Sequence, residues 1–213
     1  YIHTDAYSGY NAVSGVKRCL CYTHLRRAFV DALPKDIHNS EASKPAEAIL
    51  RLNQLFNIES ELEALPPDQK KKERLIREKP LLEAFWSWAE KSAIGELPKS
   101  KLSKAFHYAL NNREGFWNYL EDGNCSISNS LAENCIRPFV IGRKNWLFSD
   151  TPAGARASAV IYSIVETAKA NNLAPRDYIQ YLFENLPDME IQTHPERLDQ
   201  ILPWGKLIQE NFV

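Results

Sequence analysis

The stretch Asn129-Ser130-Leu131-Ala132-Glu133-Asn134-Cys135-Ile136-Arg137-Pro138 places one carboxylate at the start of a predicted helix. It runs on into Gly142-Arg143-Lys144-Asn145-Trp146-Leu147-Phe148, where basic, amide and aromatic side chains follow. A carboxylate can bind a metal ion, whereas Arg and Lys can bind phosphates and an aromatic ring can stack on a base. This combination is typical of a site that acts on a phosphodiester.

Two interpretations of Glu133 are open. Ser130 and Glu133 have the spacing of a capping box, in which Ser130 is the N-cap and Glu133 reaches back to its backbone N–H. Alternatively, Glu133 is a metal ligand, because two-metal phosphoryl transfer needs several carboxylates around the paired ions. The basic and aromatic residues that follow could likewise bind DNA or be ordinary solvated surface: Arg137, Arg143, Lys144 and Trp146.

A second candidate carboxylate, Asp5, ends the predicted strand Tyr1–Asp5. A carboxylate at a strand end is well placed to bind Mg²⁺, which prefers oxygen ligands. The alternative is that Asp5 only starts a turn, as Asp often does. Glu166 is a further acidic candidate, but its spacing also fits a helix-surface pair with Lys169.

The composition is that of an ordinary globular protein. The 213 residues are 44% hydrophobic and 25% charged, enough to bury a core in one domain or two. No apolar stretch reaches about 18 residues, so we expect no membrane span, and the N-terminus lacks a signal-peptide pattern. Four Cys residues are too few to staple a fold of this size and suit a reducing cytoplasm.

The net charge of −1 gives no global attraction to nucleic acid. The charge is unevenly distributed, however, with a basic excess over residues 130–170 and an acidic excess over residues 177–199. A local basic face is therefore compatible with the composition, whereas global electrostatic steering is not.

Short strand patterns come first and helical patterns follow. Val16–Cys21 fits a second strand, and apolar spacing predicts a helix over Thr23–Leu33. Residues 45–121 predict an all-helical block of three or four helices, in which Pro80 should kink or interrupt the second. Cys125–Ile127 fits a third short strand. Helices are then predicted from Ser130, over residues 153–171 and from Pro175.

Cys21-Tyr22-Thr23-His24 forms a C-x-x-H motif. A structural zinc site needs about four ligands, with a second pair at regular spacing, but Cys125 and Cys135 are lone residues in the sequence. A zinc-binding helical module is therefore the least favoured hypothesis. We expect His24 to be a structural or phosphate-facing residue.

Four pieces of the chain, in order, resemble the transposases of the insertion-sequence-66 family of bacterial mobile elements, members of the DDE class. The pieces are Thr4–Asn11, Cys21–Phe29, Asn129–Phe148 and Ile161–Asn171, and the terminal Leu202-Pro203-Trp204 follows them. The resemblance spans nearly the whole chain. The third and fourth pieces are long enough to make coincidence improbable.

The resemblance implies a ribonuclease-H-like α/β core in which two aspartates and one glutamate bind Mg²⁺ or Mn²⁺. The second aspartate maps onto Asp5 and the glutamate onto Glu133. The helical block then becomes a large all-α insertion, residues 34–122, in a partial core made of residues 1–33 and 123–213, with a C-terminal helical extension. Overall the chain should be helix-rich. Supporting roles are implied for Cys21, His24 and Asn129.

The implied activity of the intact enzyme is metal-dependent cleavage of DNA and strand transfer of an insertion sequence. Its partners would be the element ends and the target DNA, with a homo-oligomer expected from the class, in a bacterial cytoplasm at the nucleoid. The family's first aspartate lies upstream and has no counterpart here, so we expect the chain alone to be inactive. The alternative is a non-enzymatic DNA-binding or assembly remnant of a truncated element.

Overall fold

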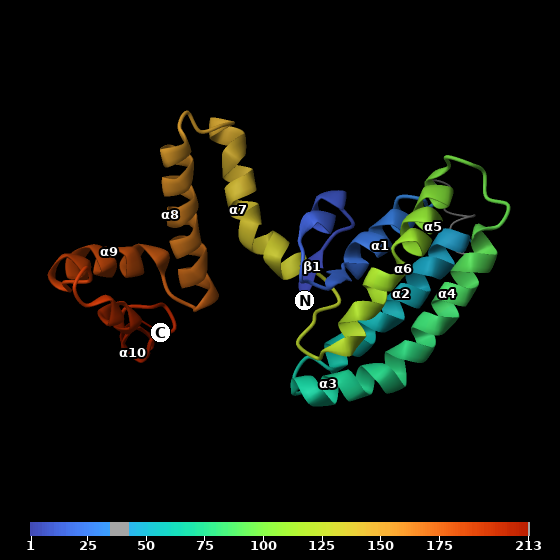
Figure 1. The fold of residues 1–213 in the computed structure, drawn as a ribbon, viewed down its shortest axis with the longest axis horizontal. Helices are drawn as coiled ribbons and strands as arrows, with labels where there is room; N and C mark the ends of the chain where they lie inside the picture. Colours follow the sequence, from blue (N-terminus) through green and yellow to red (C-terminus); the bar gives the residue numbers. More distant parts are fainter. Residues whose placement is uncertain (35–42, 213) are drawn as a thin grey trace. The chain divides into compact units, whose positions relative to one another are not determined.

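The computed structural model describes residues 1–34 and 43–212. Helices dominate it and a small parallel sheet accompanies them (Figure 1), which confirms a helix-rich α/β chain. The chain divides into two compact units, Tyr1–Ala132 and Glu133–Val213. The finer division into a catalytic core and a helical insertion stays a prediction.

The sheet consists of β1 (Ile2–Thr4) and β2 (Arg18–Leu20), which run parallel with Thr4 opposite Leu20. A 3-10 helix, η1 (Ser8–Ala12), lies in the connection between them. Both strands were predicted and both are shorter than expected. Since parallel strands end at the same edge, the residues that follow β1 and β2 are brought to one edge of the sheet.

The predicted strand over Cys125–Ile127 was wrong, because the described sheet contains β1 and β2 alone. The backbone N–H of Cys125 donates to the Asp122 carbonyl at 3.0 Å, which closes a turn. The Ile127 carbonyl accepts from the N–H of Tyr22 at 3.0 Å. Tyr22 is already the first residue of a helix, so this single bond cannot continue into a ladder.

Helices fill the rest of the first unit. The longer ones are α1 (Tyr22–Val30), α2 (Lys44–Glu61), α4 (Lys79–Ala93) and α5 (Lys101–Asn111). The shorter ones are α3 (Pro67–Glu73), α6 (Arg113–Trp117) and the 3-10 helix η4 (Asn118–Glu121). Ser43 and Ser100 cap α2 and α5, because each hydroxyl accepts from a backbone N–H three residues on. The predicted all-helical block is confirmed.

The interruption expected at Pro80 is confirmed as well. A π-helical turn, η3 (Arg74–Glu78), separates α3 from α4, which begins at Lys79-Pro80. Proline lacks an N–H and its ring collides with the carbonyl four residues earlier. The wider π turn just before it accommodates both effects.

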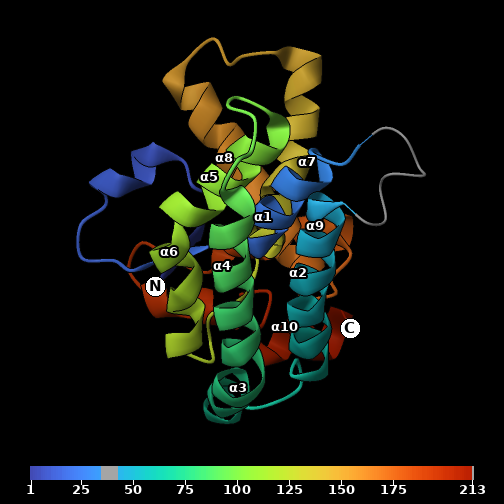
Figure 2. The same ribbon diagram turned by 90° about the vertical axis from the view of Figure 1, so that its right-hand side faces the viewer.

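One hydrophobic core joins the sheet to the helices. In it α1 packs against α2 and α5, and α4 packs against the same two helices, with α2 and α4 side by side in Figure 2. Aromatic rings meet edge to face at its centre, for example Tyr22 on Phe116 with centroids 5.0 Å apart. The largest fully buried side chains include Tyr22, Leu25, Phe29, Leu52, Leu55, Phe85, Trp86, Phe106, Phe116 and Tyr119.

The second unit contains α8 (Pro152–Ala170), α9 (Pro175–Asn185), α10 (Lys206–Phe212) and the 3-10 helices η5 (Leu186–Asp188) and η6 (Pro195–Gln200). It also holds most of α7 (Ser130–Trp146). The helices predicted from Ser130, over residues 153–171 and from Pro175 are confirmed. The core of this unit is small and comprises Ala168, Leu173, Tyr178 and Ile208.

Candidate active site

Asp5 directly follows β1, and Cys21 directly follows β2. Because Thr4 and Leu20 are paired, Asp5 and Cys21 occupy matching positions at one edge of the sheet. Asp5 Oδ1 accepts the backbone N–H of Tyr7 at 3.0 Å, so the turn interpretation of Asp5 is confirmed. An ionised carboxylate has about four lone-pair sites, so this turn is compatible with metal binding.

Arg18 holds the turn that carries Asp5. Its guanidinium donates to the carbonyl of Asp5 at 2.8 Å, to the carbonyl of Tyr7 at 3.2 Å and to the hydroxyl of Thr4 at 3.2 Å. It also donates to the side-chain oxygen of Asn11. One planar cation therefore organises most of the Thr4–Asn11 segment.

Cys21 and Asn129, both predicted as supporting residues, are brought together. The buried thiol of Cys21 accepts from the backbone N–H of Asn129 at 3.5 Å and donates to Ser128 Oγ at 3.6 Å. Ser128 Oγ also accepts from the Thr23 hydroxyl at 3.1 Å. The Asn129 side-chain oxygen is buried and has no hydrogen-bond partner among the described residues.

Tyr108 is a site neighbour that the sequence did not indicate. Burial raises the pKa of its phenol to about 12, and the nearby Cys21 and Asp5 act in the same direction. Tyr108 lies on α5, whose apolar face packs into the core. No local pattern distinguishes it from other aromatic residues of that helix.

Glu133 lies in the first turn of α7, belongs to the second unit and is partly exposed. A carboxylate in this position is favoured by the helix dipole. The backbone N–H of Ser130 donates to Ser128 Oγ at 3.0 Å, so Ser128 satisfies the donor that the capping box assigns to Glu133. The metal-ligand role of Glu133 stays a prediction.

Arg137 lies in the middle of α7, whereas Arg143, Lys144 and Trp146 lie in its last turn. Arg137 and Lys144 are exposed. The end of the helix is closed by the N–H of Leu147, whose φ is 61° and which donates to the carbonyl of Arg143 at 2.7 Å. Arg143 Nε donates in turn to the carbonyl of Leu147 at 3.2 Å, just beyond the helix. The ring centroids of Trp146 and Tyr162 are 6.0 Å apart, and 38% of the Trp146 surface is exposed.

Two further sequence candidates, His24 and Glu166, lie on helices. His24 lies in the first turn of α1 and is partly exposed. Glu166 forms a salt bridge of 2.7 Å with Lys169, three residues on. The interpretation of Glu166 as a helix-surface pairing residue is therefore confirmed.

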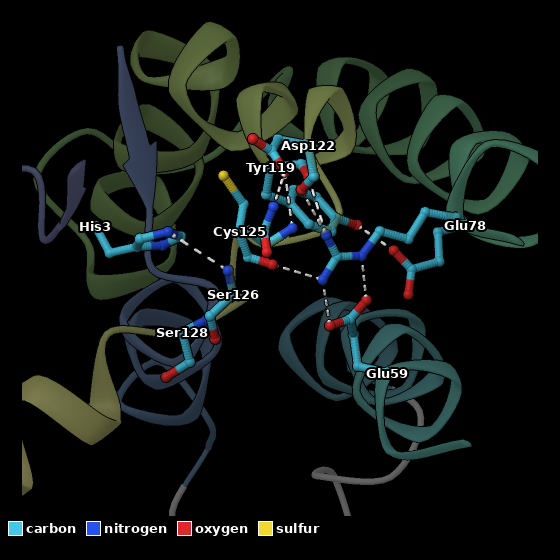
Figure 3. Close-up of polar contacts among 10 residues, drawn as sticks. His3, Glu59, Glu78, Tyr119, Asp122, Cys125, Ser126 and Ser128 are labelled. Carbon is cyan, nitrogen blue, oxygen red and sulfur yellow. Dashed lines mark hydrogen bonds and ion pairs between the residues drawn. The ribbon is translucent and has the colours of Figure 1, made fainter. Parts of the chain in front are cut away.

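A buried ion pair supports the segment that leads to Ser128. The guanidinium of Arg74 is fully buried and forms two hydrogen bonds, of 2.6 and 2.8 Å, with the carboxylate of Glu59. It also donates to the carbonyls of Tyr119, Asp122 and Cys125 (Figure 3). Arg74 thereby fixes the backbone just before the residues that pack on Cys21.

Glu78 is the second carboxylate of this network. Burial, reinforced by the charge of Glu59, raises the pKa of Glu78 to about 8, although the Tyr119 hydroxyl and Arg74 oppose the shift. The Tyr119 hydroxyl donates to Glu78 Oε2 at 2.6 Å. A buried carboxyl with this environment retains its proton near neutral pH.

Comparison with known proteins identifies the family. The model described as "Transposase IS66 family" matches residues 1–157, and the "IS66 C-terminal element" matches residues 163–204. The chain belongs to the IS66 transposase family. Among the described residues, we find no helical segment that has both the length and the apolar character of a membrane span.

Similar proteins occur in Sinorhizobium fredii. "Uncharacterized protein y4hP" is 28% identical over 219 residues, which cover 95% of this chain and 39% of that protein. "Uncharacterized protein y4qI" is 27% identical over 216 residues, with coverage of 96% and 38%. The chain thus spans about two fifths of the length of these relatives. No solved structure matches it.

Proposed function

We propose that this chain forms part of the ribonuclease-H-like catalytic region of a DDE-class transposase, which in the intact protein cleaves DNA and transfers strands of an insertion sequence. The observation that carries the proposal is the position of Asp5 at the end of one strand of a parallel pair, matched by Cys21 at the end of the other. Membership of the IS66 transposase family supports it.

The proposed metal-binding residues are Asp5 and Glu133, which offer carboxylate oxygens. Oxygen donors suit Mg²⁺ and Mn²⁺, so this donor set fits the ions that the family implies. When bound, such ions stabilise charge on the oxygens of a phosphodiester. The contribution of the chain itself is to hold Asp5 in a fixed turn, which Arg18 and the Tyr7 N–H achieve.

The proposed DNA contacts come from α7 and its C-terminal end. Arg137 and Lys144 are exposed and could neutralise phosphates, whereas Arg143 uses one guanidinium nitrogen to donate to the carbonyl of Leu147 and has others left to donate. Trp146 offers its exposed portion for stacking on a base. Cys21, His24 and Asn129 would support the site, and the intact protein would act as an oligomer on the bacterial chromosome.

The direct test replaces each acid by its amide in the intact transposase. Asp5→Asn and Glu133→Gln should each lower cleavage of a donor DNA carrying the element ends by about a hundredfold or more, because even neighbours of metal ligands cost about 10–100-fold. Circular dichroism should show an unchanged fold. Glu166→Gln is the matched control, since it removes only the pair with Lys169.

Two outcomes would contradict the proposal. If Glu133→Gln cleaves DNA as the parent does and Glu166→Gln does not cleave it, the metal-binding glutamate would be Glu166. DNA binding by the intact protein without any cleavage in Mg²⁺ or Mn²⁺ would instead support the non-enzymatic assembly protein.

A further inference from the structure

Three metal-binding side chains converge in the first unit at a place that the proposed function does not use. His3 comes from β1, Cys19 from β2 and Cys125 from the segment that follows η4. One ligand atom from each lies within 4.8 Å of the other two. His3 and Cys19 are partners in the parallel register and so project from the same face of the sheet.

We propose that His3, Cys19 and Cys125 bind a zinc ion. The Sγ atoms of Cys19 and Cys125 are 3.7 Å apart. Two thiolates, each about 2.3 Å from a tetrahedral zinc ion, are separated by about 3.8 Å. The two sulfur atoms are therefore already spaced as ligands of one ion, and both cysteines are free thiols.

The ligand chemistry selects a different ion from the one proposed at Asp5. Two sulfurs and one imidazole suit zinc, whereas Mg²⁺ and Mn²⁺ prefer oxygen donors. A divalent cation also balances the charge of two thiolates, which removes the cost of burying each of them unpaired. The three side chains leave one position of a tetrahedral zinc ion to water, which reaches it from the partly exposed His3 side because both cysteines are buried. This differs from the four protein ligands of most structural zinc sites.

The backbone around Cys125 is fixed before any ion binds. Its carbonyl accepts from Arg74 Nη2 at 2.7 Å, and its N–H donates to the Asp122 carbonyl at 3.0 Å. The ring of His3 lies beside the next residue, where His3 Nε2 accepts from the Ser126 N–H over a long 3.4 Å (Figure 3). The contacts of Cys125 hold this ligand in place, as the outer contacts of metal ligands do. The bond from Ser126 occupies the lone pair of His3 Nε2, so the ring gives up this long bond when it binds the ion through Nε2.

The position of the site gives the ion a structural role. Asp5 lies two residues after His3, and Cys21 lies two residues after Cys19. Asn129, which packs on Cys21, lies four residues after Cys125. A zinc ion would therefore fasten together the three chain segments that deliver these residues to the edge of the sheet.

The test is metal binding by the full chain, prepared without a polyhistidine tag and with its thiols reduced. The metal-free chain should bind one equivalent of Zn²⁺, and Co²⁺ should bind in its place with a thiolate charge-transfer band of two-sulfur intensity. Cys19→Ser and Cys125→Ser should each halve that band and weaken zinc binding by about a hundredfold. Cys135→Ser, which alters an exposed cysteine of α7, is the matched control and should leave both unchanged.

His3→Asn keeps the proposal testable if a buried cysteine variant fails to fold, because His3 is partly exposed. This variant should remain folded, retain the two-sulfur cobalt band and bind zinc more weakly. Zinc should also raise the melting temperature of the parent chain and not that of Cys19→Ser. None of these measurements depends on DNA cleavage. The zinc proposal can therefore fail while the proposed function holds, and the reverse.

Two results would overturn the proposal. The first is a folded, reduced chain that binds no zinc. The second is zinc binding that survives all three ligand substitutions but is lost in Cys21→Ser, which would place the ion at the C-x-x-H motif.

Discussion

Arg18 Nη2 donates to the main-chain carbonyl of Asp5 at 2.8 Å, so a cation on β2 fixes the turn that follows β1. The same guanidinium reaches the Thr4 hydroxyl and the Tyr7 carbonyl. The guanidinium thus holds the main chain at Asp5 and leaves both carboxylate oxygens untouched, of which Oδ1 accepts from the Tyr7 N–H. The orientation of a proposed metal ligand thus depends on a side chain from the neighbouring strand.

Replacing Arg18 by Lys should disturb this turn while preserving the charge. Lysine cannot reproduce the planar set of donors, so the free energy of unfolding of the chain should fall by about 1–2 kcal/mol in urea denaturation. DNA cleavage by the intact transposase should fall about tenfold. Lys17→Met is the control, because it removes only an exposed pair with Glu121; equal effects of the two substitutions would contradict the role of Arg18.

Replacing Arg74 by Met should be far more damaging than replacing a neighbouring exposed arginine. The substitution leaves the Glu59 carboxylate without its cation and removes one donor from each of three backbone carbonyls, which should cost about 3–5 kcal/mol of unfolding free energy. Arg77→Met breaks only a partly exposed pair with Glu61 and should cost far less, because solvent screens such a pair. Denaturant titrations measure the unfolding free energy of both variants. Similar decreases in the two would show that burial of the Arg74 pair does not determine its contribution.

The stability of the first unit should decline as pH rises between 4.5 and about 8, the ordinary and the raised pKa of Glu78. In this window the folded state retains a proton that the unfolded state releases, so raising the pH favours unfolding. The slope is at most about 1.4 kcal/mol per pH unit. The contribution of Glu78 is complete below 4.5 and is lost as pH rises through about 8.

Glu78→Gln tests this origin, because glutamine still accepts from the Tyr119 hydroxyl but does not titrate. The variant should show a flatter profile of unfolding free energy against pH in denaturant titrations. Glu61→Gln, at an exposed position, should keep the slope of the parent. If unfolding free energy falls with pH as steeply in Glu78→Gln as in the parent chain, another group is responsible for the pH dependence.

Gly123→Ala should destabilise the first unit by about 3 kcal/mol, because a Cβ at this position would lie 1.8 Å from the carbonyl oxygen of Pro67. Relief would require movement of the backbone at the start of α3. Gly154→Ala is the control, since the nearest atom to its Cβ is the Thr151 hydroxyl at 3.2 Å and alanine favours a helix. Melting temperatures should separate the two variants, and an unchanged Gly123→Ala would show that this contact relaxes easily.

The sequence predicted the helices well, because their signals are local. Ser43 and Ser100 cap helices where the apolar spacing begins, and Pro80 marks an interruption. These features depend on residues within one or two turns of each other. The strands were located by the same local reasoning, except at Cys125–Ile127, where apolar residues line a turn held by Tyr22.

The candidate site was only partly predictable, because its contacts join distant parts of the chain. Asp5 and Cys21 stand out as strand-end residues, and Asn129 stands out by its motif. No periodicity links Arg18 to Asp5 or Cys19 to Cys125, since each pairing is created by the parallel register and the return of the chain after η4. The metal-ligand roles of Asp5 and Glu133 remain predictions.

The shared core of the first unit limits how modular this protein can be. The helices of residues 44–121 bury their aromatic residues against Leu20, Tyr22, Leu25 and Phe29, and the Tyr22 hydroxyl donates to the carbonyl of Phe116 at 2.8 Å. If these helices were inserted into an ancestral core, they now share one hydrophobic core with its strands and its first helix. Deleting these helices would remove the hydrophobic core on which β1, β2 and α1 pack. The helical block therefore cannot be shortened or replaced as an independent module.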